Sequence, residues 1–214
     1  MKPDIVVVGA GGHAKVCIEL LRAMKIEVAW CVAGSDAPGQ CLNVPVLAGD
    51  DHMARLRAAG YGRLFVAIGA NRLREKLAGM ALELGYELVS AVSPHAIISP
   101  TARLGAGIAV MAGAIINADA VISDLAIINT GAVVDHDCQV GRAAHVGPQT
   151  ALAGNVEVGD QVMLGVGCKA IPGVRIGAGA VVGAGAAVIS DIPAGVTVVG
   201  VPARTLINRG ENRG

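Results

Sequence analysis

The sequence predicts two parts: a small α/β domain over residues 1–93 and a solenoid of short strands and turns over residues 94–214. Two observations predict this division. From Ala96 to Asp191, apolar residues recur with a period of six through sixteen consecutive hexads, without one insertion. Before that stretch, apolar runs of strand length alternate with segments of helix length, as in domains that pack helices on a parallel sheet. Ser93-Pro94 marks the junction.

In each hexad the first and third positions are apolar or small, so their side chains point to the same side of a short strand. The third positions are Ile98, Leu104, Val110, Ile116, Ile122, Ile128, Val134, Val140, Val146, Leu152, Val158, Leu164, Ala170, Ile176, Val182 and Val188. The last three positions are rich in Gly, Asn and Asp, which tolerate the backbone of a tight corner. A helix would need a period near 3.6, and a six-residue spacing drifts off any helical face. The hexads therefore predict stacked short strands joined by corners.

The first domain opens with the stretch Asp4–Val8, which is nearly all apolar and is predicted as a buried parallel strand. A glycine-rich turn over Gly9–Lys15 leads to a predicted helix from Val16 to Met24. Such a turn presents backbone N–H groups to phosphate. It also fits Gly-x-Gly-x-x-Ala of nicotinamide-binding domains, but this half-domain is short and no dehydrogenase substrate domain follows. The other predicted elements are strands near Val28–Val32, Leu64–Ile68 and Leu88–Val92, and helices near His52–Ala59 and Arg72–Leu84.

Composition narrows the classes of partner. Hydrophobic residues make up 53% and aromatic residues 2%, as expected for a narrow solenoid filled by small and aliphatic side chains. Lys plus Arg equals Asp plus Glu at 17 each, so we expect neither nucleic acid nor a membrane as partner. Cys138 and Cys168 fall at inward positions, where a thiol acts as a small hydrophobe. The first residues lack a signal peptide's basic start and long apolar segment, so we expect a reduced, cytoplasmic location.

The hexads, together with three motifs, resemble the nucleotide-sugar N-acetyltransferases of the hexapeptide-repeat family. The motifs are Gly11-Gly12-His13, Ala67–Arg74 and Asn129–Cys138. The resemblance implies an α/β N-terminal Rossmann-like domain followed by a left-handed parallel β-helix with three hexads per coil, assembled as a homotrimer. It also implies transfer of an acetyl group from acetyl-CoA to a nucleotide-linked amino sugar in polysaccharide biosynthesis such as that of O-antigen, with no metal.

The resemblance further implies which residues bind the two substrates. In the family, the sugar nucleotide meets the positions that match Gly11, Gly12, His13, Gly69 and Asn71. The family usually has an acidic residue directly after the second strand, and here Asp36 would replace it from a shifted position. The residues expected against acetyl-CoA are His145, Val166 and Ala184.

His136 is the candidate general base. It falls at the fifth position of its hexad, a corner where a side chain can leave the solenoid, and Asp137 follows at once. A neighbouring carboxylate can accept a proton from the imidazole, fix its tautomer and raise its basicity. With three hexads per coil, residues eighteen apart lie one above the other, so Gly154 is expected beside His136. Its backbone N–H would stabilise the oxyanion of acyl transfer, which is also what the family resemblance implies.

Three stretches most resemble the members of the family that acetylate GDP-perosamine, so this nucleotide sugar is the expected acceptor, through its 4-amino group. They are Arg63–Arg74, Asp124–Asp137 and Leu164–Gly173. A UDP-linked 4-amino-4,6-dideoxy sugar is the closest competitor, and O-acetylation of the sialic-acid type is another.

Two alternatives come from other classes. The γ-type carbonic anhydrases share the solenoid and hold zinc with three histidines, and His95 at the junction would have to join His136 and His145. A noncatalytic sugar-nucleotide sensor is the second. It would bind its ligand without releasing coenzyme A.

Overall fold

The computed structural model describes residues 5–206, so Asp4 and the chain ends of both predicted domains lie outside the described residues. The first part is a six-stranded sheet in the order β3-β4-β2-β1-β5-β6 with helices on both faces. Its elements are β1 (Ile5–Val8), α1 (Gly12–Ala23), β2 (Val28–Ala33), β3 (Gln40–Cys41), β4 (Val44–Ala48), α2 (Asp51–Ala58), β5 (Arg63–Val66), α3 (Asn71–Glu83) and β6 (Glu87–Leu88). All neighbouring strands are parallel except the β3–β4 hairpin.

Alternate residues of the central strands face opposite layers, as the pleat of a strand requires. Val7 and Phe65 pack against α1 on one face, whereas Val6 and Leu64 pack against α2 and α3 on the other. Because β1 and β5 are parallel neighbours, their carboxyl ends meet at the same edge of the sheet. The turns that enter α1 and α3 therefore lie side by side.

Three features of the first domain differ from the prediction. Helix α1 begins at Gly12, so the glycine-rich turn already forms its first helical turn. The strand predicted over Leu88–Val92 is divided, because β6 pairs with β5 whereas β7 (Ala91–Val92) pairs with β10 of the solenoid. The β3–β4 hairpin was not predicted, since its turn residues Leu42 and Asn43 both adopt positive φ, and leucine seldom marks such a turn.

The solenoid consists of short strands in three sheets, which we call sheets I, II and III. Sheet I contains β7, β10 (Ala109–Val110), β13 (Ile127–Ile128), β16 (His145–Val146), β19 (Met163–Leu164), β22 (Val181–Val182), β24 (Thr197–Val199) and β25 (Arg204–Thr205). Sheet II contains β8 (Ile97–Ile98), β11 (Ile115–Ile116), β14 (Val133–Val134), β17 (Ala151–Leu152), β20 (Lys169–Ala170) and β23 (Ala187–Val188). Sheet III contains β9 (Arg103–Leu104), β12 (Val121–Ile122), β15 (Gln139–Val140), β18 (Glu157–Val158) and β21 (Arg175–Ile176).

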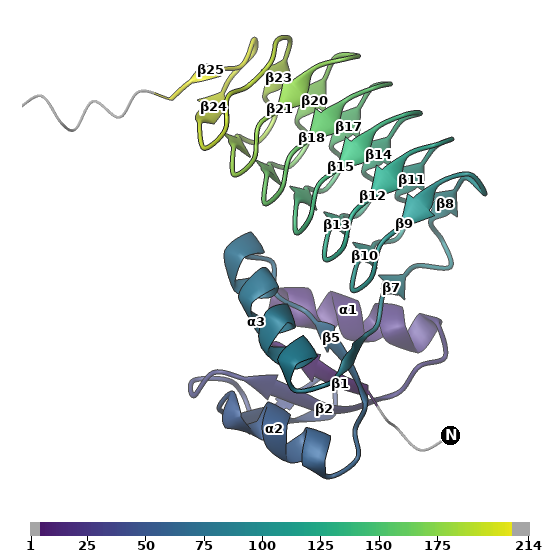
Figure 1. The fold of residues 1–214 in the computed structure, drawn as a ribbon, viewed down its shortest axis with the longest axis vertical. Coiled ribbons are helices and arrows are strands. Elements are labelled where there is room, and N and C mark those ends of the chain that lie inside the picture. Colours follow the sequence, from purple (N-terminus) through teal and green to yellow (C-terminus); the bar gives the residue numbers. More distant parts are fainter. Residues whose placement is uncertain (1–4, 207–214) are drawn as a thin grey trace, which may run out of the picture.

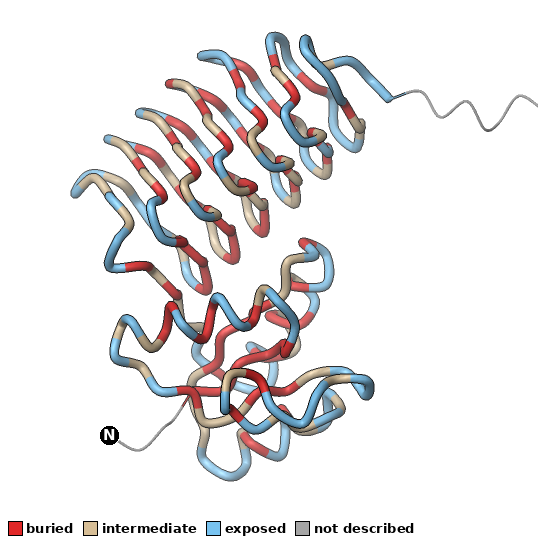
Figure 2. The backbone as a smooth tube through the Cα atoms, turned by 180° about the vertical axis from the view of Figure 1, so that it is seen from behind, coloured by how far each residue is buried: buried red, intermediate tan, exposed pale blue. Residues whose placement is uncertain are grey.

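Each coil uses one hexad per sheet, so strands eighteen residues apart pair in parallel, as Ile128 does with Val146. The first and third hexad positions form one continuous buried core along the axis, which Figure 2 shows as buried segments repeating from coil to coil. Cys138 and Cys168 belong to this core and are free thiols, as the sequence predicted. Helices α1 and α3 lie next to the first coils, with α2 farther away (Figure 1). None of the helices within residues 5–206 is long and apolar enough to cross a membrane.

The corners of the solenoid are closed by left-handed residues. From Gly107 to Gly185 the sixth residue of every hexad has positive φ, including non-glycine residues such as Leu125 (62°), Asp137 (57°) and Ala143 (51°). This conformation turns the chain from one sheet to the next, and it re-aims the side chain and carbonyl of that residue. We name the corners by the sheets that they join: I–II, II–III and III–I.

Candidate active site

His136 and Asp137 lie together at the II–III corner. The Nδ1 atom of His136 is 2.8 Å from Oδ2 of Asp137, and because a carboxylate only accepts, Nδ1 carries the proton and donates it. The two side chains are 54% and 52% exposed. The hydrogen bond to Asp137 raises the pKa of His136, and the Nε2 lone pair is left to accept a proton from a substrate. Positive φ at Asp137 turns its carboxylate back toward the preceding residue, so the predicted pairing is confirmed.

A second carboxylate fixes the backbone of this corner. Oδ1 of Asp135 accepts the backbone N–H of His136 at 2.8 Å and the side-chain amide of Asn117, one coil earlier, also at 2.8 Å. The bond from Asn117 lowers the pKa of Asp135, which keeps that carboxylate ionised. Its negative charge, like that of Asp137, raises the pKa of His136.

Gly154 lies directly beneath the imidazole of His136. A Cβ atom on Gly154 would overlap the ring, with Nε2 only 2.5 Å away, and the backbone N–H of Asn155 donates to the carbonyl of His136 at 3.0 Å. The predicted proximity is therefore confirmed, and only glycine leaves room for the ring in this position. Within residues 5–206 the backbone N–H of Gly154 donates no hydrogen bond, so it is available to an oxyanion.

The residues predicted to bind the sugar nucleotide gather at the carboxyl edge of the α/β sheet. Gly11 is the N-cap of α1, no side chain caps this end, and both Gly11 and Gly12 are exposed. His13 is half-buried, and burial, followed by the charge of Arg74, lowers its pKa, so its ring is neutral. Asp36 lies in the exposed turn after β2, also at the carboxyl end of a strand of this sheet, where it accepts a hydrogen bond from Ser35.

His145 is predicted against acetyl-CoA, yet the structure places it between the two domains. Its ring centroid is 6.4 Å from that of His13. Nε2 lies 3.0 Å from the side-chain amide of Asn129, which donates, so the proton is on Nδ1, 3.4 Å from the carbonyl of Gly69. Burial, followed by the charge of Arg74, lowers the pKa of His145 to about 4.

The side chain of Asn71 is engaged in the domain interface. Its Nδ2 donates to the carbonyls of Gln161 (2.9 Å) and Val162 (3.0 Å), and its Oδ1 accepts from Arg74. Arg74 itself, 1% exposed, was not predicted as a site residue. The signal for it is its position on α3, where it shares the buried face with Leu77, Ala78 and Ala81, a face on which a charge needs partners.

The remaining predicted acetyl-CoA residues lie at yet another corner. Val166 is 54% exposed and Ala184 is also exposed, and both occupy the fifth position of hexads that end at the I–II corner. His136 and Gly154 lie at the II–III corner, and the α/β domain packs at the III–I corner. One chain therefore does not bring the three predicted groups of site residues together.

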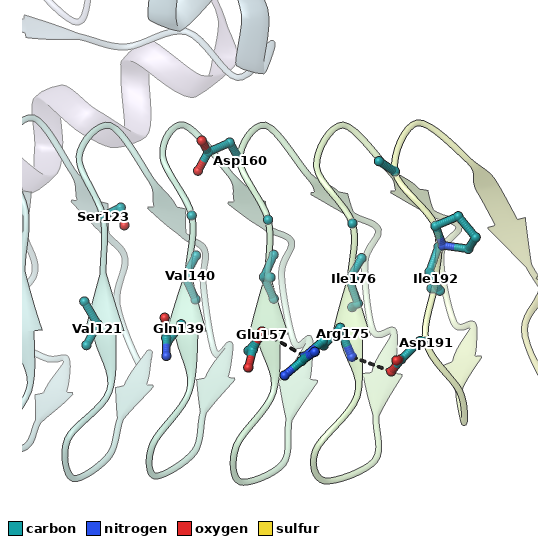
Figure 3. Close-up of a pocket in the computed structure, with 16 residues that line it drawn as sticks. Val121, Ser123, Gln139, Val140, Glu157, Asp160, Arg175, Ile176, Asp191 and Ile192 are labelled. Atoms are coloured by element: carbon teal, nitrogen blue, oxygen red, sulfur yellow. Dashed lines mark hydrogen bonds and ion pairs between the residues drawn. The ribbon is translucent and has the colours of Figure 1, made fainter.

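A cavity of about 680 Å³ on the outer face of sheet III contains none of the predicted site residues (Figure 3). The outward side chains Gln139, Glu157 and Arg175 follow one another along it, and Glu157 and Arg175 form an ion pair of 3.1 Å. Within residues 5–206, no three His, Cys, Asp or Glu side chains lie close enough to hold a metal ion.

This chain is similar to one family of protein domains and to several solved structures. The family described as the PglD N-terminal domain matches residues 4–81. The structure of PerB from Caulobacter crescentus in complex with CoA and GDP-perosamine is 54% identical over 97% of this chain and 99% of that chain, with a TM-score of 0.93. The acetyltransferase domain of PglB from Neisseria gonorrhoeae, in complex with acetyl coenzyme A, is 36% identical over 96% of this chain and 100% of that domain, with a TM-score of 0.89.

WeeI from Acinetobacter baumannii is similar at 28% identity over 94% of this chain and 99% of that chain, with a TM-score of 0.87. A search of curated protein sequences found no match.

Proposed function

This chain belongs to the hexapeptide-repeat nucleotide-sugar N-acetyltransferases, and from that premise we propose that it transfers the acetyl group of acetyl-CoA to the 4-amino group of GDP-perosamine. The observation that carries the proposal is the 54% identity, over nearly the whole of both chains, to PerB with CoA and GDP-perosamine bound. The II–III corner offers the groups that such a reaction needs, a basic imidazole beside the backbone N–H of Gly154, which donates to no acceptor within residues 5–206.

In the proposed reaction the sugar amine attacks the thioester carbonyl directly, with no covalent enzyme intermediate. Nε2 of His136 accepts the amine proton as the C–N bond forms, and Asp137 stabilises the imidazolium through Nδ1–H. The N–H of Gly154 stabilises the oxyanion of the tetrahedral intermediate. The C–S bond then breaks, and the coenzyme A thiolate leaves and takes the proton.

For the acceptor, we propose that the open first turn of α1 at Gly11 and Gly12 receives the diphosphate, because uncapped helix N–H groups attract anions. His13 and the Gly69 loop would contact the sugar, and Asp36 the nucleoside. Since the Asn71 amide is already bonded to the solenoid, its contribution to substrate binding would come from its backbone at the start of α3.

The separation of the three groups of site residues supports a homotrimer. A base at the II–III corner of one chain reaches an amine held at the III–I corner only if a neighbouring chain supplies one of them. We propose that acetyl-CoA binds between neighbouring chains. Val166 and Ala184 would contact it from the solenoid of one chain, and His145 would also contact it. We further propose a left-handed coil, a cytoplasmic location and a product used in polysaccharide assembly such as that of O-antigen. We place the division of the domains just before β7 instead of between residues 93 and 94, because β7 already pairs with β10 of the solenoid.

The first experiment is a thiol-release assay across GDP-, UDP- and dTDP-linked 4-amino-4,6-dideoxy sugars. We expect GDP-perosamine to give the highest kcat/KM. A preference for a UDP-linked sugar would reassign the acceptor. If no sugar nucleotide led to release of coenzyme A, the proposed enzymatic activity would be contradicted and the noncatalytic sensor would be the remaining interpretation. Metal analysis of the purified protein tests the zinc alternative, in which zinc would copurify with His95, His136 and His145 as ligands.

The second experiment replaces the base. His136→Asn should lower kcat by ~10²–10⁴-fold, the usual contribution of a general base, because an amide cannot accept the proton. Binding of GDP-perosamine and acetyl-CoA should stay within threefold of the wild type. Turnover by this variant within threefold of the wild type would remove His136 from the reaction.

A further inference from the structure

The III–I corner presents a column of backbone carbonyls that the solenoid does not use. Within residues 5–206, no backbone N–H is bonded to the carbonyl of any sixth-position residue from Gly107 to Gly185. At the III–I corner the residues in this position include Leu125, Ala143 and Gln161, eighteen residues apart, so their carbonyls recur once per coil. A buried carbonyl without a partner is costly, so whatever covers this column has to supply donors.

Helix α3 supplies these donors with two side chains, one helical turn apart. Arg74 donates from Nε to the carbonyl of Leu125 at 2.8 Å and from Nη2 to that of Ala143 at 2.7 Å. Asn71 donates to the carbonyl of Gln161 at 2.9 Å. Three successive coils are therefore each bonded to α3 through the same corner position.

The same guanidinium also holds the loop that enters α3. Nη1 of Arg74 donates to the carbonyls of Ile68 and Gly69, both at 3.0 Å, and Nη2 donates to Oδ1 of Asn71 at 3.0 Å. The Gly69 carbonyl is in turn the neighbour of His145. Arg74 therefore joins the carboxyl edge of the α/β sheet directly to two coils of the solenoid.

A second, partly exposed set of contacts also joins α3 to the solenoid. Arg142 is bonded to Glu75 of α3 at 3.0 Å and to Asp124 at 3.0 Å, and Glu75 also accepts a hydrogen bond from Gln161. Being about one-third exposed, this network adds less than the buried bonds. Within residues 5–206, Arg74 is the side chain that donates hydrogen bonds to the largest number of carbonyls across the two domains, those of Leu125, Ala143 and Ala144.

We propose that Arg74 is a positioning residue that sets the register of the nucleotide-binding domain along the coils of the solenoid, and thereby aims the acceptor amine. This inference rests on the proposed function. The corner carbonyls repeat with the strand spacing of ~4.8 Å, so a shift of α3 by one coil would move the bound acceptor by about 5 Å. Productive attack needs the reacting atoms within ~3–3.5 Å, and a misplacement of about 1 Å already costs ~10²-fold in rate.

The test separates aiming from binding. Arg74→Met removes every donor at nearly the same length, and we expect kcat with GDP-perosamine to fall about 100-fold. Dissociation constants for GDP alone and for acetyl-CoA should stay within threefold of the wild type, because each ligand meets only one side of the interface. Arg74→Lys keeps the charge but has a single donor atom, so kcat should again fall, by less. Arg55→Met, in which a 70% exposed arginine is removed from α2, is the matched control and should keep wild-type kinetics.

Three results would overturn the proposal: a folded Arg74→Met variant with kcat within threefold of the wild type, loss of GDP binding in parallel with kcat, or failure of both Arg74 variants to fold. The second would assign the guanidinium to the nucleotide site itself, and the third would assign it to folding. A wild-type protein that acetylates no nucleotide sugar would instead contradict the proposed function. An active wild type with insensitive Arg74 variants contradicts only the role of Arg74.

Discussion

Gly154→Ala should abolish most activity while leaving the fold intact. The added Cβ would overlap the imidazole of His136, because Nε2 would be only 2.5 Å away, well inside van der Waals contact, and Nδ1 3.1 Å away. Since the His136 side chain is 54% exposed, the ring has room to swing outward and would do so. It would then leave both its hydrogen bond to Asp137 and its place above the Gly154 N–H.

Gly154→Ala is expected to have a small effect on stability and a large effect on activity. Gly154 does not have a positive φ, so alanine fits its backbone, and such replacements stabilise a protein by ~0.4–1 kcal/mol through the unfolded chain. We therefore expect the free energy of unfolding to change by less than about 1 kcal/mol. Loss of an aligned general base removes ~10²–10⁴-fold in kcat.

The assay is steady-state thiol release with GDP-perosamine, alongside thermal unfolding of the same samples. Gly79→Ala is the matched control, because a Cβ on this helical glycine of α3 has no atom within 4 Å other than its chain neighbours and the backbone of its own helix, and it should keep wild-type activity. A Gly154→Ala variant that retains more than a third of the wild-type kcat would refute the close stacking of His136 on Gly154 as a requirement for catalysis.

Three further predictions concern pH and packing. Because the bond to Asp137 is the first cause of the raised pKa of His136, Asp137→Asn should move the acid limb of the kcat–pH profile to lower pH and reduce its plateau, and an unmoved limb would contradict the pairing. The lowered pKa of His145, about 4, means that the unfolded chain binds this proton more tightly. Stability should therefore be complete above pH ~6.5 and fall by up to about 3 kcal/mol as the pH drops toward 4, a slope that thermal unfolding should show flattened in His145→Asn. Leu164→Ala should cost ~2–5 kcal/mol in urea unfolding, because Leu164 is 1% exposed in the solenoid core, and a loss below 1 kcal/mol would mean that neighbouring coils collapse around it.

Much of the II–III corner was predictable because the repeat is local. Each coil contacts mainly the next, so a period of six with three hexads per coil decides which residues point inward and which stack eighteen apart. The stacking predicted the proximity of His136 and Gly154, and the position of His136 and Asp137 next to each other at a corner predicted their pairing. The roles of all the predicted site residues in catalysis and in substrate binding stay predictions. These residues are His136, Asp137, Gly154, Gly11, Gly12, His13, Asp36, Gly69, Asn71, His145, Val166 and Ala184.

The sequence by itself determined the repeat, its buried columns and the corner that carries His136, because these follow from periodicity within one stretch of chain. Only the tertiary structure decided where the α/β domain rests, and therefore that Gly11, Gly12, His13 and Gly69 lie at a different corner of the solenoid from His136. That placement depends on Asn71 and Arg74 donating to backbone carbonyls 51 to 91 residues away. Every residue has a backbone carbonyl, so the sequence does not indicate which carbonyls accept hydrogen bonds from a distant guanidinium.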